Sequence, residues 1–122
     1  MKMFWFSAIL LLTALIGVSV NYIYINEVCD TLIEQIETLP DVNDDNCLAS
    51  AKHIADYWNE QVDYAGLSAS YVITDRISEQ TETLVACAEV GDLFGFRTAL
   101  ALLRDAVGDL RRLESFSIGN IL

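Results

Sequence analysis

The sequence lacks charge over its whole first part, since no acidic or basic side chain occurs from Met3 to Val20. At about 1.5 Å of rise per residue, this stretch makes a helix of about 27 Å, close to the ~30 Å hydrocarbon core of a bilayer. Aromatic residues at both ends fit the two membrane interfaces. We therefore expect residues 1–25 to be a transmembrane anchor that contacts the lipid bilayer through residues 3–25.

Basic residues are also scarce, because seven Lys and Arg face eighteen Asp and Glu, for a net charge of −11. Beyond Lys2, six bases face eighteen acids, for a net charge of −12. Such a surface repels phosphate groups, so we expect no nucleic acid and no peripheral lipid binding. A solvated face that keeps the domain soluble, a basic partner and a cation remain as explanations.

The position of the first bases predicts the orientation of the anchor. No base occurs between Lys2 and Lys52. Because Lys and Arg near a membrane span favour the cytoplasmic side, we expect a single-pass protein of the cell membrane. Its N-terminus is expected in the cytoplasm and its domain, residues 26–122, outside.

A cleavable signal peptide is the alternative to an anchor, since Gly17-Val18-Ser19 resembles a cleavage site. The apolar character continues to Ile25, which is longer than a usual signal and favours the uncleaved anchor. A lipoprotein signal is excluded because Asn26-Glu27-Val28 precedes Cys29. A type IV pilin start is excluded because the apolar run has no early acidic residue.

Helix breakers are absent from Val18 to Leu39, and Pro40 is the one proline of the chain. The membrane helix is therefore expected to continue unbroken into the domain until Pro40. Its apolar residues follow a helical spacing of threes and fours, typical of one buried stripe. They are Ile25, Cys29, Leu32, Ile36 and Leu39.

Three more helical patterns follow, and with the first they predict helices at about 22–39, 45–64, 70–90 and 93–116. The turns are expected at residues 41–45, at 65–70 and at Gly91, with Asn43, Asp44 or Asp45 capping the second helix and Asp92 the fourth. The predicted inner faces are Leu48, Ala51, Ile54, Ala55, Trp58 and Val62; then Tyr71, Ile77, Thr81, Leu84 and Ala88; then Leu93, Phe96, Leu100, Leu103, Val107, Leu110 and Leu113 or Glu114. We therefore predict an all-α fold, in which the N-terminal transmembrane helix runs into an antiparallel up-down-up-down helical bundle.

Closely spaced cysteines are absent, and the three that occur form no metal or redox motif. In the predicted bundle Cys47 and Cys87 lie at the same membrane-distal end. A disulfide between them and two buried free thiols both fit this placement. Cys29 is expected to pack in the core.

Catalytic combinations are absent as well. His53 is the one histidine, and neither a Glu-x-x-His pair nor a Ser-His-Asp or Cys-His order accompanies it. We expect no enzyme activity, no cofactor and no metal site. Trp58 is expected to fill core space beside small neighbours.

Arg97, Arg104 and Arg111 recur every seven residues beside the apolar stripe of the last helix. Internal ion pairs with neighbouring helices are expected to occupy them, rather than a bound anion. The carboxylates within reach are Glu27, Asp30 and Glu34, or Asp75, Glu79 and Glu82.

The order of these features resembles that of domain-of-unknown-function family 4363, small single-pass helical membrane proteins of endospore-forming Firmicutes. The resemblance rests on the apolar first helix, the central Trp58, the unit Asp75-Arg76-Ile77 and the ending Glu114-Ser115-Phe116-Ser117-Ile118-Gly119-Asn120-Ile121-Leu122. Where many members carry a His-acidic cluster, this chain has Tyr71-Val72-Ile73-Thr74. The resemblance implies a membrane location, a helical domain and an accessory role beside a larger membrane protein.

The function expected from these features is that of a non-enzymatic accessory subunit that binds another integral membrane protein. The alternative is an extracytoplasmic sensing module that binds a small ligand or cation. The predicted contact surface for the partner is the apolar ending: Phe116, Ser117, Ile118, Asn120, Ile121 and Leu122.

Overall fold

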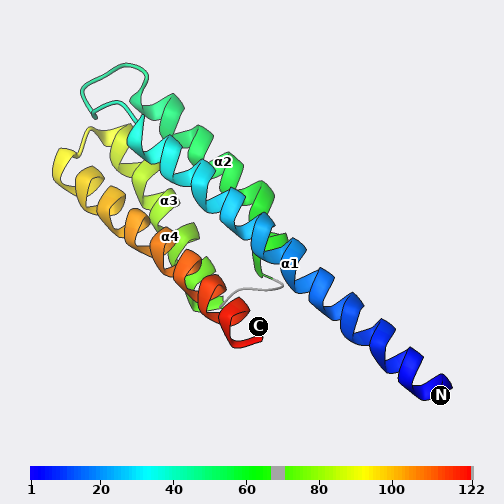
Figure 1. Ribbon diagram of the computed structural model, residues 1–122. Helices are drawn as coiled ribbons and strands as arrows, with labels where there is room; N and C mark the ends of the chain where they lie inside the picture. The colour runs from blue at the N-terminus through cyan, green and yellow to red at the C-terminus, as the bar shows by residue number, and fades with distance from the viewer. Residues whose placement is uncertain (67–70, 122) are drawn as a thin grey trace.

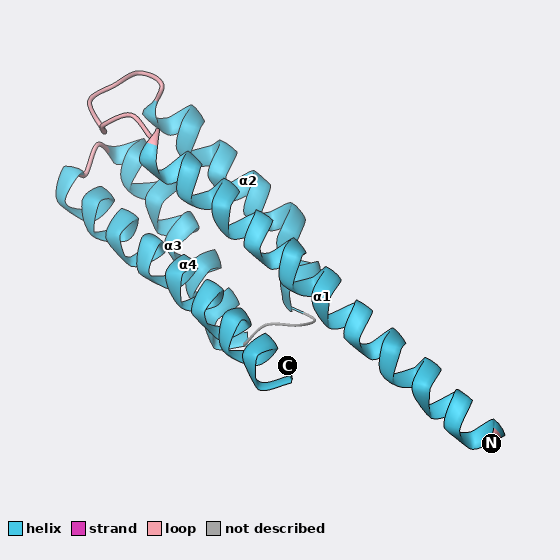
Figure 2. Ribbon diagram, in the orientation of Figure 1, coloured by secondary structure: helices cyan, strands magenta, loops and turns pink. Residues whose placement is uncertain are grey.

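The computed structural model describes the backbone of residues 1–66 and 71–121, and the side chains of residues 1–63 and 71–115. Within these ranges every regular element is a helix (Figures 1 and 2). The helices are α1 (Lys2–Glu37), α2 (Cys47–Gly66), α3 (Tyr71–Val90) and α4 (Leu93–Ile121). The predicted all-α class is confirmed, whereas most of the predicted turn at 65–70 lies outside the described residues.

α1 is one continuous helix of 36 residues, and the expected passage from the apolar run into the domain occurs without a break. Its N-terminal half projects beyond the other three helices (Figure 1). Its buried side chains begin only at Ile25 and end at Ile36. The same helix therefore has an exposed apolar half and a half that builds the core.

The core lies between the four helices and follows the predicted stripes closely. Trp58, Leu103, Val107 and Leu110 are completely buried, and the Trp58 indole Nε1 donates a hydrogen bond of 2.8 Å to Ser78 Oγ. The prediction that Tyr71 lies inside is wrong: it is 75% exposed, because the buried stripe of α3 starts one turn later at Thr74. The same holds for Leu93, which is exposed, because the buried stripe of α4 starts at Phe96. The other buried side chains of α2, α3 and α4 are Cys47, Ala51, Ile54, Thr74, Ile77, Thr81, Leu84, Cys87, Phe96, Ala99, Ala106 and Glu114.

The helix ends follow the local chemistry of the turns. Gly91 has a φ of +73°, and the Asp92 N–H donates to the Cys87 carbonyl at 3.0 Å, which closes α3 with a Schellman motif. Asp92 Oδ1 then accepts the Gly95 N–H at 3.0 Å and caps α4, as predicted. At the turn between α1 and α2, Asp44 Oδ1 accepts the Asn46 N–H at 2.8 Å, and α2 starts at Cys47, two residues later than expected.

Each helix contacts two others: α1 and α3 both pack against α2 and α4. Contacts between α1 and α4 join Asn21 to Glu114 and Cys29 to Val107, and Asp41 in the turn after α1 meets Arg97. Later residues of α1 and its following turn thus contact earlier residues of α4. As a result the C-terminal end of α4 lies beside the middle of α1, and α4 remains helical to Ile121, beyond the predicted end near 116 (Figure 1).

Candidate functional site

The candidate site is the junction on α1 where the exposed apolar half meets the helix bundle. The apolar half is long and apolar enough to cross a membrane, and its most apolar stretch of 18 residues has no buried residue. Among the first twenty residues, Leu15 and Val18 are the ones that are partly shielded from solvent. They lie about two turns and one turn before Asn21, on the side that carries the polar contact to α4.

Asn21 and Glu114 form the polar contact that joins this junction to α4. Asn21 Nδ2 donates a hydrogen bond of 3.2 Å to Glu114 Oε2. Glu114 is 7% exposed, and no other carboxyl group among the described side chains is buried. Burial raises the pKa of the Glu114 carboxyl above its usual value. A buried acid held by a neutral amide is costly in its charged form, so this contact is sensitive to protonation.

A second polar contact, between α1 and α2, lies one turn further along α1. The Tyr24 hydroxyl donates a hydrogen bond to Gln61 Oε1. Together with Asn21 it places polar groups of α1 toward both of its neighbours at the level where the bundle begins. The apolar half of α1 therefore meets the domain through hydrogen bonds, and the core residue Ile25 follows directly.

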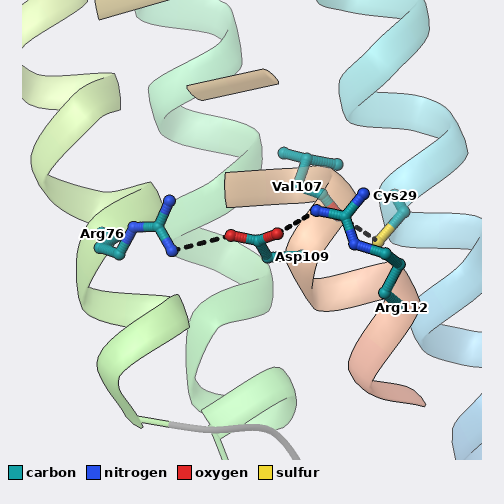
Figure 3. Close-up of polar contacts among 5 residues, drawn as sticks. All are labelled: Cys29, Arg76, Val107, Asp109 and Arg112. Atoms are coloured by element: carbon teal, nitrogen blue, oxygen red, sulfur yellow. Dashed lines mark hydrogen bonds and ion pairs between the residues drawn. The ribbon is translucent and has the colours of Figure 1, made fainter. Parts of the chain in front are cut away.

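Above these contacts, Cys29 packs against α4 beside charged groups. Its thiol Sγ lies 3.8 Å from the Val107 carbonyl oxygen, to which it donates (Figure 3). Burial raises the pKa of Cys29 to about 11, and the Arg111 guanidinium opposes this rise only in part. Cys29 is therefore a protonated core thiol, which agrees with the expected packing role and gives no nucleophile.

An ion-pair network centred on Asp109 joins α3 to α4. Asp109 lies between two guanidinium groups, with Arg76 Nη1 at 2.9 Å from Oδ2 and Arg112 Nη2 bonded to Oδ1 (Figure 3). These hydrogen bonds, first from Arg76 and then from Arg112, lower the pKa of the Asp109 carboxyl. Asp109 thus stays ionised and ties α3 to the C-terminal part of α4.

The arginines singled out from the sequence have different surroundings. Arg111 pairs with Asp30 of α1, one of the carboxylates expected for it. Arg97 pairs with Asp41 at 3.5 Å, which lies in the turn after α1 and is not among the expected partners. Arg104 is exposed and makes no ion pair with the described residues. Internal pairing therefore occupies Arg111 and, weakly, Arg97.

The remaining predicted residues differ in their surroundings. Trp58 and Ile77 are buried in the core, and Asp75 is exposed on α3. Cys47 and Cys87 are both buried free thiols, which is one of the two alternatives left open. The predicted partner-binding side chains of residues 116–122 lie outside the described residues, although the backbone through Ile121 is helical. Among the described residues no group of three or more His, Cys, Asp or Glu side chains is placed to hold a metal.

Several residues of the junction were not found from the sequence. Asn21 is a single polar side chain within an apolar run, and this interruption is the one feature of the sequence that indicates a polar contact there. Glu114 was one of two choices for the end of the inner stripe. Gln61 and Asp109 carry no distinctive spacing, because their role depends on which helices become neighbours.

Comparisons of the chain with family models, curated proteins and solved structures find no match. The resemblance to domain-of-unknown-function family 4363 therefore stays a prediction based on the residues quoted for it.

Proposed function

We propose that this protein is a single-pass membrane protein whose helical domain serves as an accessory, non-enzymatic subunit of a larger integral membrane protein. In this proposal residues 3–25 span the cell membrane, with the N-terminus in the cytoplasm and residues 21–25 at the outer interface, where the bundle begins. The domain outside is an antiparallel up-down-up-down bundle rooted in the bilayer by its first helix.

The observation that carries the proposal is the continuity of α1. An uncharged half with no buried residue leads, without a helix break, into the half that contributes Ile25, Cys29 and Leu32 to the core. A soluble protein would bury such a run, whereas a bilayer is the solvent that accepts it. The mechanical consequence is that anchor and domain form one rigid unit.

The contact surface in this proposal is the end of α4 beside the anchor. Asn21–Glu114 holds α4 against α1 at the junction, and α4 continues beyond this contact to Ile121. After Glu114 the sequence Ser115-Phe116-Ser117-Ile118-Gly119-Asn120-Ile121-Leu122 carries no charged side chain. Two uncharged helical segments that meet at this junction suit a partner helix within the membrane, where packing and hydrogen bonds drive association.

Deletion of residues 116–122 tests the proposal in native membranes. Full-length and truncated protein are crosslinked and purified, and the proteins recovered with each are compared. We expect a discrete membrane protein with the full-length chain and its loss on truncation. A second variant, Ile118→Asn, keeps the chain length, and Tyr71→Ser is the control at an exposed residue of α3. Recovery of the same partner with the truncated, still folded protein contradicts the proposal.

A sensing module is the second candidate, and a pocket between α1 and α2 favours it. The pocket has a volume of about 480 Å³ and a partly polar lining that includes Gln35, Thr38, Asn46, Ser50 and His53. Thermal melts of the full chain with spermidine and with glucose test it against a cationic and a neutral ligand. A saturable rise of the melting temperature that Ser50→Leu abolishes supports this function, and no rise with either ligand counts against it.

A further inference from the structure

Three helices of the bundle reach the level of the junction, where the apolar half of α1 begins. The Tyr24 hydroxyl of α1 donates to Gln61 of α2, and Asn21 of α1 donates to Glu114 of α4. α2 continues from Gln61 to Gly66, toward the apolar half of α1 (Figure 1). At about 1.5 Å per residue, the end of α2 therefore lies about 8 Å beyond Gln61 along the bundle axis.

α3 begins at the same level. Arg76 Nη1 of α3 lies 2.9 Å from Asp109 Oδ2 of α4, and the two helices are joined at Gly91 and pack against each other. Tyr71 precedes Arg76 by five residues, and Glu114 follows Asp109 by five. The start of α3 therefore lies at about the level of Glu114, which is the level of the junction.

The sequence is uncharged at each of these helix ends. No acidic or basic side chain occurs from Met3 to Asn26, from Tyr64 to Thr74 or from Ser115 to Leu122. All eighteen acidic residues of the chain lie outside these three segments. The strongly acidic domain is thus free of charged residues in the sequence segments that lead to the junction.

The start of α3 also exposes apolar side chains at this level. Tyr71 is 75% exposed and Val72 is 68% exposed. Tyrosine is enriched at membrane interfaces, because its ring enters the apolar region while its hydroxyl stays in water. Tyr22 and Tyr24 of α1 lie at the same level, so aromatic residues of two helices lie where the proposed span leaves the membrane.

We propose that this end of the bundle, with Tyr71 and Val72 at the start of α3, lies in the outer headgroup interface of the bilayer. The inference rests on the proposed membrane span of residues 3–25 and adds a second lipid contact on a different helix. Because the anchor holds the domain at the membrane, the contact needs no attraction between lipid charges and the acidic surface. Two contacts, one on α1 and one on α3, then limit the tilt of the domain.

Charged side chains near this end limit the depth of the contact. Asp63 of α2, Asp75 of α3 and Arg112 of α4 are exposed. A charged side chain is costly in hydrocarbon but not among headgroups and water. Tyr71 and Val72 therefore reach the headgroup region and not the hydrocarbon core.

The test uses the full-length protein in phosphatidylcholine nanodiscs, with a nitroxide spin label on Val72→Cys. Val90→Cys, at the other end of α3 and 79% exposed, is the matched control for water, and Ile9→Cys, 62% exposed in the apolar half, is the control for lipid. Power saturation measures collisions of each label with oxygen, which concentrates in lipid, and with a water-soluble nickel chelate. We expect the ratio of oxygen to nickel collisions at Val72 to exceed that at Val90 at least about threefold and to lie below that at Ile9.

Wild-type protein treated with the same label gives the background from its three buried cysteines. Tyr71→Asp, added to the Val72→Cys variant, is expected to lower the collision ratio toward the Val90 value, because it places a charge in the contact. Circular dichroism verifies that each variant keeps its helices. The nanodiscs hold no other membrane protein, so the result does not depend on a partner of the tail.

Two results overturn the proposal. A label at Val72 that meets nickel as freely as the label at Val90 lies in water, and a label that meets neither reagent is covered by protein. If its spectrum is broadened and sharpens on dilution with unlabelled protein, the cover is a second copy. Water access at Ile9 refutes the span itself, whereas lipid access at Ile9 with water access at Val72 refutes only this second contact.

Discussion

At the residue scale, the two glycines Gly95 and Gly108 of α4 have opposite surroundings. A Cβ at Gly95 would lie 2.4 Å from Asp92 Oδ2 and 2.8 Å from Cys87 Sγ, whereas a Cβ at Gly108 would have its nearest neighbour, Arg112 Nη1, at 3.8 Å. Alanine favours a helix by about 1 kcal/mol over glycine where there is space. Crowding against a capping carboxylate and a buried sulfur typically costs about 1–3 kcal/mol.

We therefore expect Gly108→Ala to raise the free energy of unfolding by up to about 1 kcal/mol and Gly95→Ala to lower it. Denaturant titration in detergent, followed by circular dichroism, measures both. Each variant serves as the control for the other, since both add one methyl group to the same helix. Equal stabilisation by the two changes would contradict the close approach at Gly95.

Two carboxylates of α4 predict opposite pH dependences of stability. The pKa of Glu114 is raised by burial, so the folded state holds its proton more tightly, and stability falls as pH rises from the usual value near 4.5 through the raised pKa. The pKa of Asp109 is lowered by Arg76 and Arg112, so its contribution is present above the usual value near 3.8 and is lost as pH falls through the lowered pKa.

We expect Glu114→Gln to stabilise the protein at neutral pH and to flatten the loss of stability above about pH 4.5. Asp109→Asn is expected to destabilise the protein at neutral pH and to flatten the loss below about pH 3.8. Melting temperatures between pH 3 and pH 8 measure both, with the exposed Glu60→Gln as the control. A melting temperature of Glu114→Gln that follows the wild type at every pH would show that Glu114 is not buried in solution.

At the scale of the helices, the spacing of apolar residues along the sequence predicted most of the fold. The stripe from Ile25 to Ile36 and the stripe through Leu103, Val107 and Leu110 are buried as expected, because spacing of threes and fours depends only on the geometry of one helix. Helix ends shifted by a few residues: Asp44 bonds to Asn46 before α2 begins at Cys47, and α4 continues through Gly119 to Ile121.

The junction and the ion pairs could not be predicted in the same way. Asn21 and Glu114 are 93 positions apart in the sequence, and their contact depends on the register between α1 and α4. Arg97 meets Asp41 in a turn, where spacing along a helix gives no information. Phe94 carries the apolar character of a core residue, and only the three-dimensional arrangement reveals that it faces outward.

The continuity of α1 leads to a prediction about its local stability. Because one hydrogen-bonded helix joins the apolar half to the core, we expect backbone amides from Val18 to Leu32 to exchange slowly in lipid nanodiscs, without an interruption. Amides of the turn at residues 41–46 serve as the fast-exchanging control. A fast-exchanging segment near Asn21 would contradict the single rigid helix and separate anchor from domain.

At the scale of the whole molecule, charge and hydrophobicity divide the chain into three parts. Lys2 precedes the apolar half, that half is uncharged from Met3 to Val20, and the remainder carries a net charge of −12. Because positive residues favour the cytoplasmic side, this division predicts the direction in which the domain faces. The direction is measurable with a thiol reagent that does not cross membranes.

We expect such a maleimide, added to intact cells, to label Asp44→Cys in the exposed turn after α1 and not Met3→Cys at the N-terminal end. Met3→Cys is expected to react once the membrane is permeabilised. The wild-type protein is the control, since its three cysteines are buried and the pKa of Cys29 is raised to about 11. Labelling of Met3→Cys alone in intact cells would contradict the predicted orientation and place the domain in the cytoplasm. If mass spectrometry shows that the mature chain lacks the N-terminal residues, this segment is a cleaved signal peptide and not an anchor.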